Sequence, residues 1–217
     1  MSDFESRSAA EPADPDVEAP ARKRPKPGER RVQILQALAA MLEQPGGERI
    51  TTAGLAARLE VSEAALYRHF ASKAQMFEGL IEFIEQSVFS LISQITTTGA
   101  GDGRQQVARI VAMLLQFGEK NPGMARVMVG DALVFENERL QQRMNLFFDK
   151  IESVLRQSLR DGALGEGSST PGADAQAQAV VLTAFVVGQL QRFTRSGFRR
   201  VPTDKLDACL SRMLFIA

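Results

Sequence analysis

The sequence predicts an all-α fold, and three observations favour that fold class. Apolar residues in the longer segments recur at intervals of three and four, the spacing that places side chains on one face of a helix. Short runs of Gly, Pro and Asn separate these segments and give the breaks expected between helices. The alternation typical of a half-buried strand is not found along the sequence. At 217 residues, the chain can form one sizeable helical domain, or two smaller domains that share a helix.

The N-terminal segment, residues 1–28, has the composition of a disordered tail. It holds five prolines, many charges and few apolar residues, so it cannot bury enough surface to fold by itself. Residues 1–21 carry six acidic residues against one arginine. A basic arm follows immediately: Arg22, Lys23, Arg24 and Lys26. Such an arm either follows DNA phosphates or serves as a solvated linker, and both readings stay open.

The first helix is expected over residues 29–43, where Pro45-Gly46-Gly47 ends an inward apolar stripe. Residues 51–70, TTAGLAARLEVSEAALYRHF, then predict a helix-turn-helix. Thr51 and Ser62 suit the N-caps of its two short helices, because a hydroxyl can accept a free backbone N–H. The turn between them falls around Glu60-Val61.

The second of these short helices has two distinct faces. Leu66 and Phe70 are four residues apart and should point inward. The opposite face combines small and polar residues: Glu63, Ala64, Tyr67 and Arg68. Small side chains flanked by Tyr and Arg suit a DNA major groove, where the phosphates lie at the edges. An ordinary helical hairpin with a solvated outer face is the alternative.

Charge supports a DNA-binding domain over residues 29–74. The whole chain has a formal net charge of zero, but residues 22–74 carry ten Lys and Arg against five acidic residues, a net charge of +5. The average over the chain hides this basic region.

The remainder, residues 75–217, should form a C-terminal helical domain. Further helices are expected at about residues 72–98, 104–120, 124–135, 138–160, 174–196 and 204–215. The helix over 174–196 is apolar around most of its circumference, so it should be buried on more than one side. Either a second copy of the chain or a monomer core would satisfy this requirement.

The sequence also resembles a known family. SEAALYRHF, preceded by LAARLEV and followed by SKAQMFEGLIEFIEQSVFSLI, resembles the DNA-binding domain of the tetracycline-repressor-like (TetR) regulators. Further along, FGEKNPGM, DALVFENERLQQRMN and RFTRSGFRRVPTDKLDA resemble an atypical branch of that family, the nucleoid occlusion factors. The similarity runs from about Arg30 to the C-terminus. It implies a TetR-like fold, in which an N-terminal three-helix helix-turn-helix domain precedes a C-terminal helical dimerisation domain.

The resemblance, together with the face described above, implies a set of DNA contacts: Thr51, Thr52, Ser62, Glu63, Ala64, Tyr67, Arg68, His69 and Lys73. Tyr67 and Lys73 match family positions that contact the DNA backbone. His69 has no partner histidine, so packing or a phosphate contact is favoured over catalysis. Glu60 stands where the family commonly has Gly. If the turn needs a positive φ there, Glu60 costs about 1 kcal/mol relative to Gly.

A second surface is expected on the helix that begins near Ser72. Phe83 lies roughly 120° from the centre of that helix's apolar stripe, which suits either satellite packing or an exposed anchor for a partner. The resemblance favours an anchor, because nucleoid occlusion factors receive the C-terminal tail of the division protein FtsZ between their fourth and fifth helices. It places Lys120 and Asn121 on the far wall of that groove. Lys120 replaces an arginine of a known relative, and Leu91 stands where a basic residue is usual.

Three classes of function follow from these observations. The leading one is a homodimer that binds palindromic double-stranded DNA and, when bound, antagonises FtsZ ring assembly over the chromosome. The alternative is a ligand-responsive TetR-type transcriptional repressor, whose C-terminal domain would enclose a small molecule. An enzyme has least support, since the sequence offers no nucleophile–base pair, phosphate loop or metal cluster, and we expect no cofactor. With one cysteine, Cys209, and no long apolar run, we expect a cytoplasmic, nucleoid-associated protein without membrane contact.

Overall fold

The structure, a computed structural model, describes residues 28–44, 50–98, 102–163 and 171–214. Within these ranges the chain is all-helical, as the sequence predicts. The α-helices are α1 (Glu29–Leu42), α2 (Thr52–Arg58), α3 (Glu63–Tyr67), α4 (Lys73–Thr97), α5 (Gly103–Lys120), α6 (Pro122–Met128), α7 (Glu138–Ala163), α8 (Pro171–Arg195) and α9 (Leu206–Leu214). A short 3₁₀-helix, η1 (Asp131–Leu133), lies between α6 and α7.

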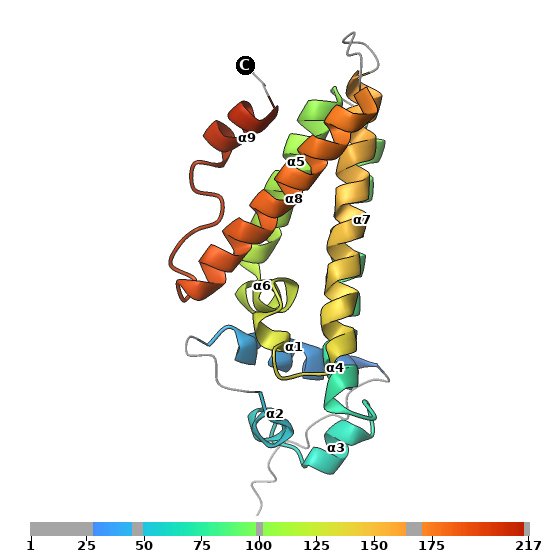
Figure 1. Ribbon diagram of the computed structural model, residues 1–217. Coiled ribbons are helices and arrows are strands. Elements are labelled where there is room, and N and C mark those ends of the chain that lie inside the picture. The colour runs from blue at the N-terminus through green and yellow to red at the C-terminus, as the bar shows by residue number, and fades with distance from the viewer. Residues whose placement is uncertain (1–27, 45–49, 99–101, 164–170, 215–217) are drawn as a thin grey trace, which may run out of the picture.

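The helices form a small lower part and a taller upper part (Figure 1). Helices α1, α2 and α3 lie together at the lower end, with α4 rising from them into the upper part. There α5, α7 and α8 pack against one another, and α9 lies against α5 and α8. The arrangement confirms the expected architecture of a three-helix domain joined to a larger helical domain.

One hydrophobic core runs through both parts of the molecule. Leu38 and Phe70 contribute to it from the lower part, and Leu114, Phe147 and Leu190 from the upper part. Helix α4 joins the two parts because its apolar stripe is buried along its length: Phe77, Ile81, Ile84, Val88 and Ile92. The lower part is therefore held rigidly to the upper part rather than tethered by a linker.

The helix predicted over residues 124–135 is wrong in its extent. Helix α6 ends at Met128, and the chain then turns at Gly130 into η1. Gly130 has a φ of 81°, a left-handed conformation that glycine adopts without steric cost. A Cβ atom at this position would also collide with the side chain of Gln141.

Helix α6 connects the two parts of the molecule through a close contact with α1. A Cβ atom on Gly123 would overlap the carbonyl oxygen of Ala39, so only glycine allows the two helices to approach this closely. Arg126 Nη1 donates a hydrogen bond to the carbonyl oxygen of Leu42 at 3.1 Å, at the last residue of α1. The position of the lower part is thus set by α6 as well as by α4.

Candidate nucleic-acid interface and partner groove

The two short helices of the lower part begin at the predicted N-caps. Thr51 Oγ1 accepts a hydrogen bond from the backbone N–H of Gly54 at 3.1 Å. Ser62 Oγ accepts one from the backbone N–H of Ala65 at 3.3 Å. Each hydroxyl satisfies a donor that the helix leaves unpaired, so both residues have a structural role whatever they contact outside the protein.

The turn between α2 and α3 has a positive φ at Glu60, the position where the related family commonly has Gly. Glu60 adopts a φ of 54°. The backbone N–H of Glu60 donates to Ala57 O at 3.1 Å, and that of Val61 donates to Ala56 O at 3.0 Å. This pair of bonds is the Schellman motif, which usually has glycine at the left-handed position. Glu60 therefore holds a strained conformation close to the candidate DNA-binding face.

Helix α3 presents the outer face that the sequence predicts. Leu66 and Phe70 are buried, whereas the residues of the opposite face are exposed: Glu63, Ala64, Tyr67, Arg68 and His69. Thr52 Oγ1 donates a hydrogen bond to Glu63 Oε2 at 2.6 Å, which joins α2 to α3. This bond holds the Glu63 carboxylate beside α2 and leaves the Tyr67 end of the helix unobstructed for a phosphate contact.

A contact that sequence reasoning missed ties α1 to the end of the helix-turn-helix. Arg31 Nη1 donates to the carbonyl oxygen of His69 at 2.8 Å, and the guanidinium carbon lies 4.2 Å from the centre of the Phe70 ring. The partners are 38 residues apart, and no local pattern indicates such a pairing. Since Arg31 lies in the first turn of α1, this contact holds the start of α1 next to the residues that follow α3.

Lys73, a predicted DNA contact, already has a partner within the chain. Its ammonium forms an ion pair with Glu136, which lies between η1 and α7. The two side chains are only 21% and 9% exposed, respectively. The ammonium also lies 5.7 Å from the centre of the Phe77 ring. The structure thus places Lys73 at the edge of the DNA-binding face but pairs it with the upper part of the molecule.

Phe83 is exposed, as the partner-anchor hypothesis requires. It is 48% exposed on α4, a helix whose other large apolar side chains are mostly buried. Helices α4 and α5 run antiparallel, and an open groove of about 530 Å³ lies between them. The residues lining it are Leu91, Gln94, Ile95, Thr97, Thr98, Arg109 and Met113. Leu91, which departs from the family pattern, makes this wall more apolar.

Phe83 and the predicted far wall, Lys120 and Asn121, lie outside the set of residues that line this groove. Phe83 is about 12 Å before Leu91 along α4, and Lys120 is about 10 Å beyond Met113 along α5. Because the helices are antiparallel, both residues lie toward the same end of the groove. Lys120 is exposed. Asn121 is half-buried at the junction of α5 and α6, where its Nδ2 donates to Phe117 O at 2.7 Å, so it fixes this junction.

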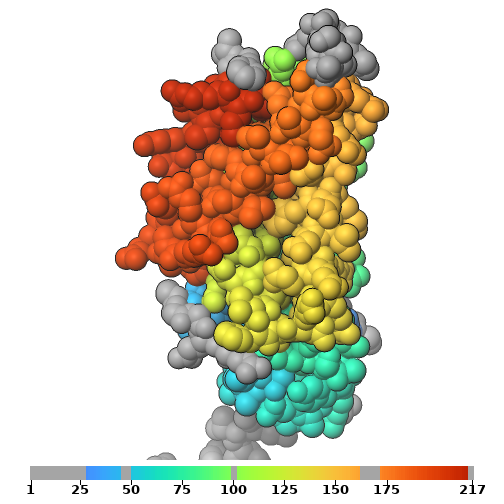
Figure 2. Space-filling model, viewed as in Figure 1, coloured from blue at the N-terminus to red at the C-terminus, as the bar shows by residue number. Residues whose placement is uncertain are grey.

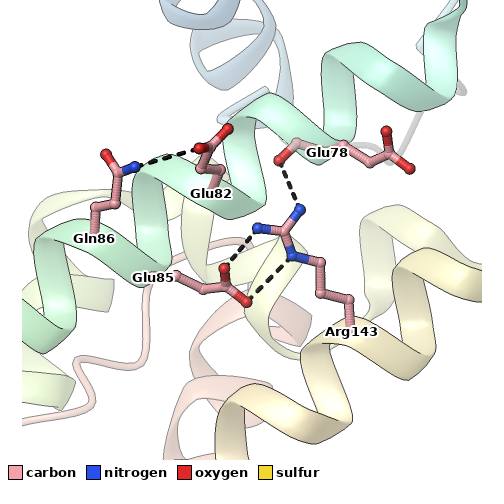
Figure 3. A network of polar contacts seen from close by, with 5 residues as sticks. All are labelled: Glu78, Glu82, Glu85, Gln86 and Arg143. Carbon is pink, nitrogen blue, oxygen red and sulfur yellow. Dashed lines mark hydrogen bonds and ion pairs between the residues drawn. The ribbon is translucent and has the colours of Figure 1, made fainter.

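A row of ion pairs joins α4 to α7 on the side away from Phe83. Arg143 donates to both carboxylate oxygens of Glu85 (Figure 3). One turn earlier on α7, Arg139 pairs with Glu78 at 2.7 Å. The hydrogen bonds to Glu85 raise the pKa of Arg143 above its ordinary value, so its guanidinium stays charged. We call this row the α4–α7 seam. Sequence reasoning missed it, because facing charges on two helices do not reveal which helices pack together.

Helix α8 leaves one apolar face uncovered within the protomer. Leu182, Val186 and Leu190 are buried, but Val180 and Val181 are 46% and 54% exposed. In the space-filling view, α8 and α9 (orange to red) form one side of the upper part (Figure 2). A Cβ atom added to the glycine on this helix, Gly188, would meet open space. The sequence predicts that this helix is buried on more than one side, and a single chain therefore covers only part of its apolar surface.

The described residues define the class of protein. Residues 34–80 match the family described as bacterial regulatory proteins of the tetR family. Residues 102–215 match the SlmA-like group of tetracyclin repressor-like C-terminal domains. The chain belongs to the SlmA-like family of TetR-type regulators, which agrees with the expectation that it is not an enzyme.

Particular relatives are closely similar to this chain. The nucleoid occlusion factor SlmA of Vibrio cholerae serotype O1 is 52% identical over 179 residues, which cover 82% of this chain and 90% of that protein. The nucleoid occlusion factor SlmA of Shewanella sediminis is 51% identical over 178 residues, covering 82% and 89% respectively.

Solved structures share the fold at much lower identity. The MbdR regulator from Azoarcus sp. CIB superposes with a TM-score of 0.70 at 18% identity, over 85% of this chain and 97% of that one. FadR from Bacillus subtilis, solved with stearoyl-CoA, gives a TM-score of 0.66 at 13% identity, over 84% and 97%. These likenesses confirm the TetR-like fold.

Within the described ranges, no helix is both long and apolar enough to cross a membrane. The same residues contain no group of three or more His, Cys, Asp or Glu side chains placed to hold a metal ion.

Proposed function

We propose that this protein is a nucleoid occlusion factor: a homodimer that binds palindromic DNA and, in the DNA-bound state, antagonises FtsZ ring assembly over the chromosome. The observation that carries the proposal is the exposure of Phe83 on α4, about 12 Å along the helix from Leu91, where the α4–α5 groove begins. The curated relatives at about half identity bear the name of nucleoid occlusion factors, which supports the same function here. The proposal places the protein in the cytoplasm, associated with the nucleoid.

The outer face of α3 supports DNA binding. Its exposed residues combine small side chains in the middle with Tyr67, Arg68 and His69 at the C-terminal end. Small side chains allow close approach to base edges, and the hydroxyl and cationic groups suit phosphates. Thr51, Thr52 and Ser62 add hydroxyls near the starts of α2 and α3. In a dimer, two such faces would read half-sites about 34 Å apart.

The uncovered face of α8 supports dimerisation. Exposed Val180 and Val181 form apolar surface that a second copy can bury. The open space at Gly188 allows a partner helix to approach closely. With α9 beside it, α8 would form half of a four-helix bundle about the two-fold axis.

The α4–α5 groove supports a peptide partner with apolar and acidic residues. Met113 provides apolar surface and Arg109 positive charge within the groove. Phe83 and Lys120 are both exposed beyond the end of the groove, where they add an aromatic ring and a second positive charge. An aromatic anchor flanked by charge is the usual arrangement of an energetic hot spot. The C-terminal tail of FtsZ is the proposed occupant.

The ligand-responsive repressor receives less support. The relatives at about half identity bear the name of nucleoid occlusion factors, and not of repressors. The FadR neighbour was solved with stearoyl-CoA, but at 13% identity it shares only the fold.

The test is binding of an FtsZ C-terminal tail peptide to the full-length protein, with and without a palindromic duplex selected in vitro against it. We expect tail binding only with the duplex, and we expect Phe83→Ala to abolish it while duplex binding stays at the wild-type level. Phe83→Ala should cost much less stability than the roughly 3–5 kcal/mol of a core Phe truncation, because the ring is half exposed. Lys120→Glu should also weaken tail binding, through charge repulsion.

Phe135→Ala is the matched control. Phe135 is 74% exposed and lies between η1 and α7, outside the α4–α5 groove. It should leave both binding reactions unchanged. If the Phe83→Ala variant still bound the tail peptide, the protein would not use this groove. A repressor without this partner would then be the better account of its function.

A further inference from the structure

The ion pair between Lys73 and Glu136 lies where the DNA-binding face meets the upper part of the molecule. Lys73 is the first residue of α4, immediately after the N-cap Ser72 and six residues beyond Tyr67. A cation at this position is well placed to contact a phosphate of bound DNA. In the structure its ammonium is instead held by a carboxylate from the other part of the chain.

Glu136 is held firmly in place by its neighbours along the chain. Its backbone N–H donates to Leu133 O at 3.0 Å, which continues the turn of η1. The next residue, Asn137, accepts a hydrogen bond from the backbone N–H of Arg139 at 3.1 Å and so caps the start of α7. The carboxylate is only 9% exposed. Its ion pair with Lys73 holds it against the first residue of α4.

The pair opposes DNA binding for two physical reasons. A lysine that contacts a phosphate strengthens binding by releasing a counterion condensed on the DNA. A lysine held by Glu136 does not neutralise that phosphate, so the counterion stays on the DNA. If a phosphate replaced Glu136, the carboxylate would be left poorly solvated and unpaired, which is costly. If the phosphate and the Glu136 carboxylate both contacted Lys73, the two negative groups would lie close together and repel each other.

We propose that Glu136 is an internal competitor of DNA phosphate for Lys73 and sets the DNA affinity below the value that the helix-turn-helix alone would give. This inference rests on the proposed DNA binding. The residue acts through Lys73 and has no contact with DNA of its own. Because Glu136 belongs to the segment that leads into α7, the contact also links occupancy of the DNA to the upper part of the molecule.

The experiment measures the dissociation constant of full-length protein and a selected palindromic duplex as a function of salt concentration. Glu136→Gln should raise affinity about threefold to tenfold near 0.1 M salt, the factor for one charge-assisted contact regained. It should also steepen the plot of log K against log salt by about 0.9, the increment for one phosphate contact. Lys73→Met in the Glu136→Gln background should reverse both changes.

Glu138→Gln is the matched control, since it removes the same charge two residues away. Glu138 is exposed in the first turn of α7 and is bonded to Gln142 at 3.4 Å. It should leave the salt slope unchanged. If Glu136→Gln behaves like Glu138→Gln, Lys73 is not held back by Glu136 and the inference is wrong.

A second variant tests the inference even if Glu136→Gln does not fold. Lys73→Met alone should leave the wild-type salt slope unchanged, because the paired lysine does not contribute to it. A slope reduced by about 0.9 would show Lys73 already on a phosphate and overturn the inference. If the wild-type protein itself failed to prefer the palindrome over a scrambled duplex, the proposed DNA binding would fall, and this inference with it.

Discussion

Arg143 on α7 donates two hydrogen bonds to Glu85 on α4, from Nε at 3.2 Å and from Nη2 at 2.6 Å (Figure 3). A fork of this kind fixes both the distance and the relative orientation of the two helices. Helix α4 continues from the helix-turn-helix, so the α4–α7 seam sets where the DNA-binding face stands relative to the upper part.

Arg143→Gln should lower the free energy of unfolding by about 1–2 kcal/mol, since it removes charge-assisted bonds from a partly exposed pair. Chemical denaturation would measure this change. Arg156→Gln is the control on the same helix, because Arg156 is exposed and bonds the neutral amide of Gln176. Equal losses for the two variants would mean that the seam contributes nothing beyond an ordinary surface arginine.

Tyr67→Phe should weaken binding to a selected palindrome by about fivefold to tenfold while the melting temperature stays constant. The phenol is 44% exposed, so its loss removes one hydrogen bond to phosphate and no internal packing. Titration and thermal unfolding of the same samples check both parts. A matching fall in stability would assign Tyr67 to the fold instead of the DNA.

Thr51→Ala should reduce stability as well as DNA affinity, because Thr51 caps α2. Loss of the cap costs about 1 kcal/mol. Thr51→Ser keeps the hydroxyl and should retain both properties. The comparison separates the two roles: if alanine lowers stability but not affinity, Thr51 is a cap alone.

Glu60→Gly should raise the free energy of unfolding by up to about 1 kcal/mol, because glycine adopts the φ of 54° without strain. It should also strengthen DNA binding by removing a negative charge near the duplex. Glu60→Gln removes the charge but keeps the strained backbone, so it should strengthen binding without the gain in stability. Equal stability of the two variants would show that the conformation costs nothing here.

Deletion of residues 1–21 should increase DNA affinity modestly, because this segment, with six acids and one base, precedes the basic arm in the sequence and can compete with phosphate for it. Deletion of residues 1–28 should reverse that gain by removing the basic arm as well. Titrations of both truncations at one salt concentration measure the effect. Identical affinities for the full chain and both truncations would show the segment to be inert; residues 1–27 lie outside the described part of the structure.

Much of the local structure followed from the sequence. The all-α class, the N-caps Thr51 and Ser62, the inward Leu66 and Phe70, and the exposure of Phe83 were all predicted and are confirmed. The extent of the helix over 124–135 was predicted wrongly, since a left-handed glycine interrupts it at Gly130. The DNA contacts and the FtsZ tail remain predictions.

The sequence by itself determined the properties that depend on only a few neighbouring residues: helical periodicity, caps, turns and the separation of inner from outer faces. These depend on backbone geometry and on neighbours three or four positions away. Only the tertiary structure decided the pairs Arg31–His69, Lys73–Glu136 and Glu85–Arg143. The two residues of these pairs are 38, 63 and 58 positions apart, respectively. Such pairs arise only when helix packing fixes which faces meet, because a charged side chain at the edge of a helix can find its partner on any neighbouring element.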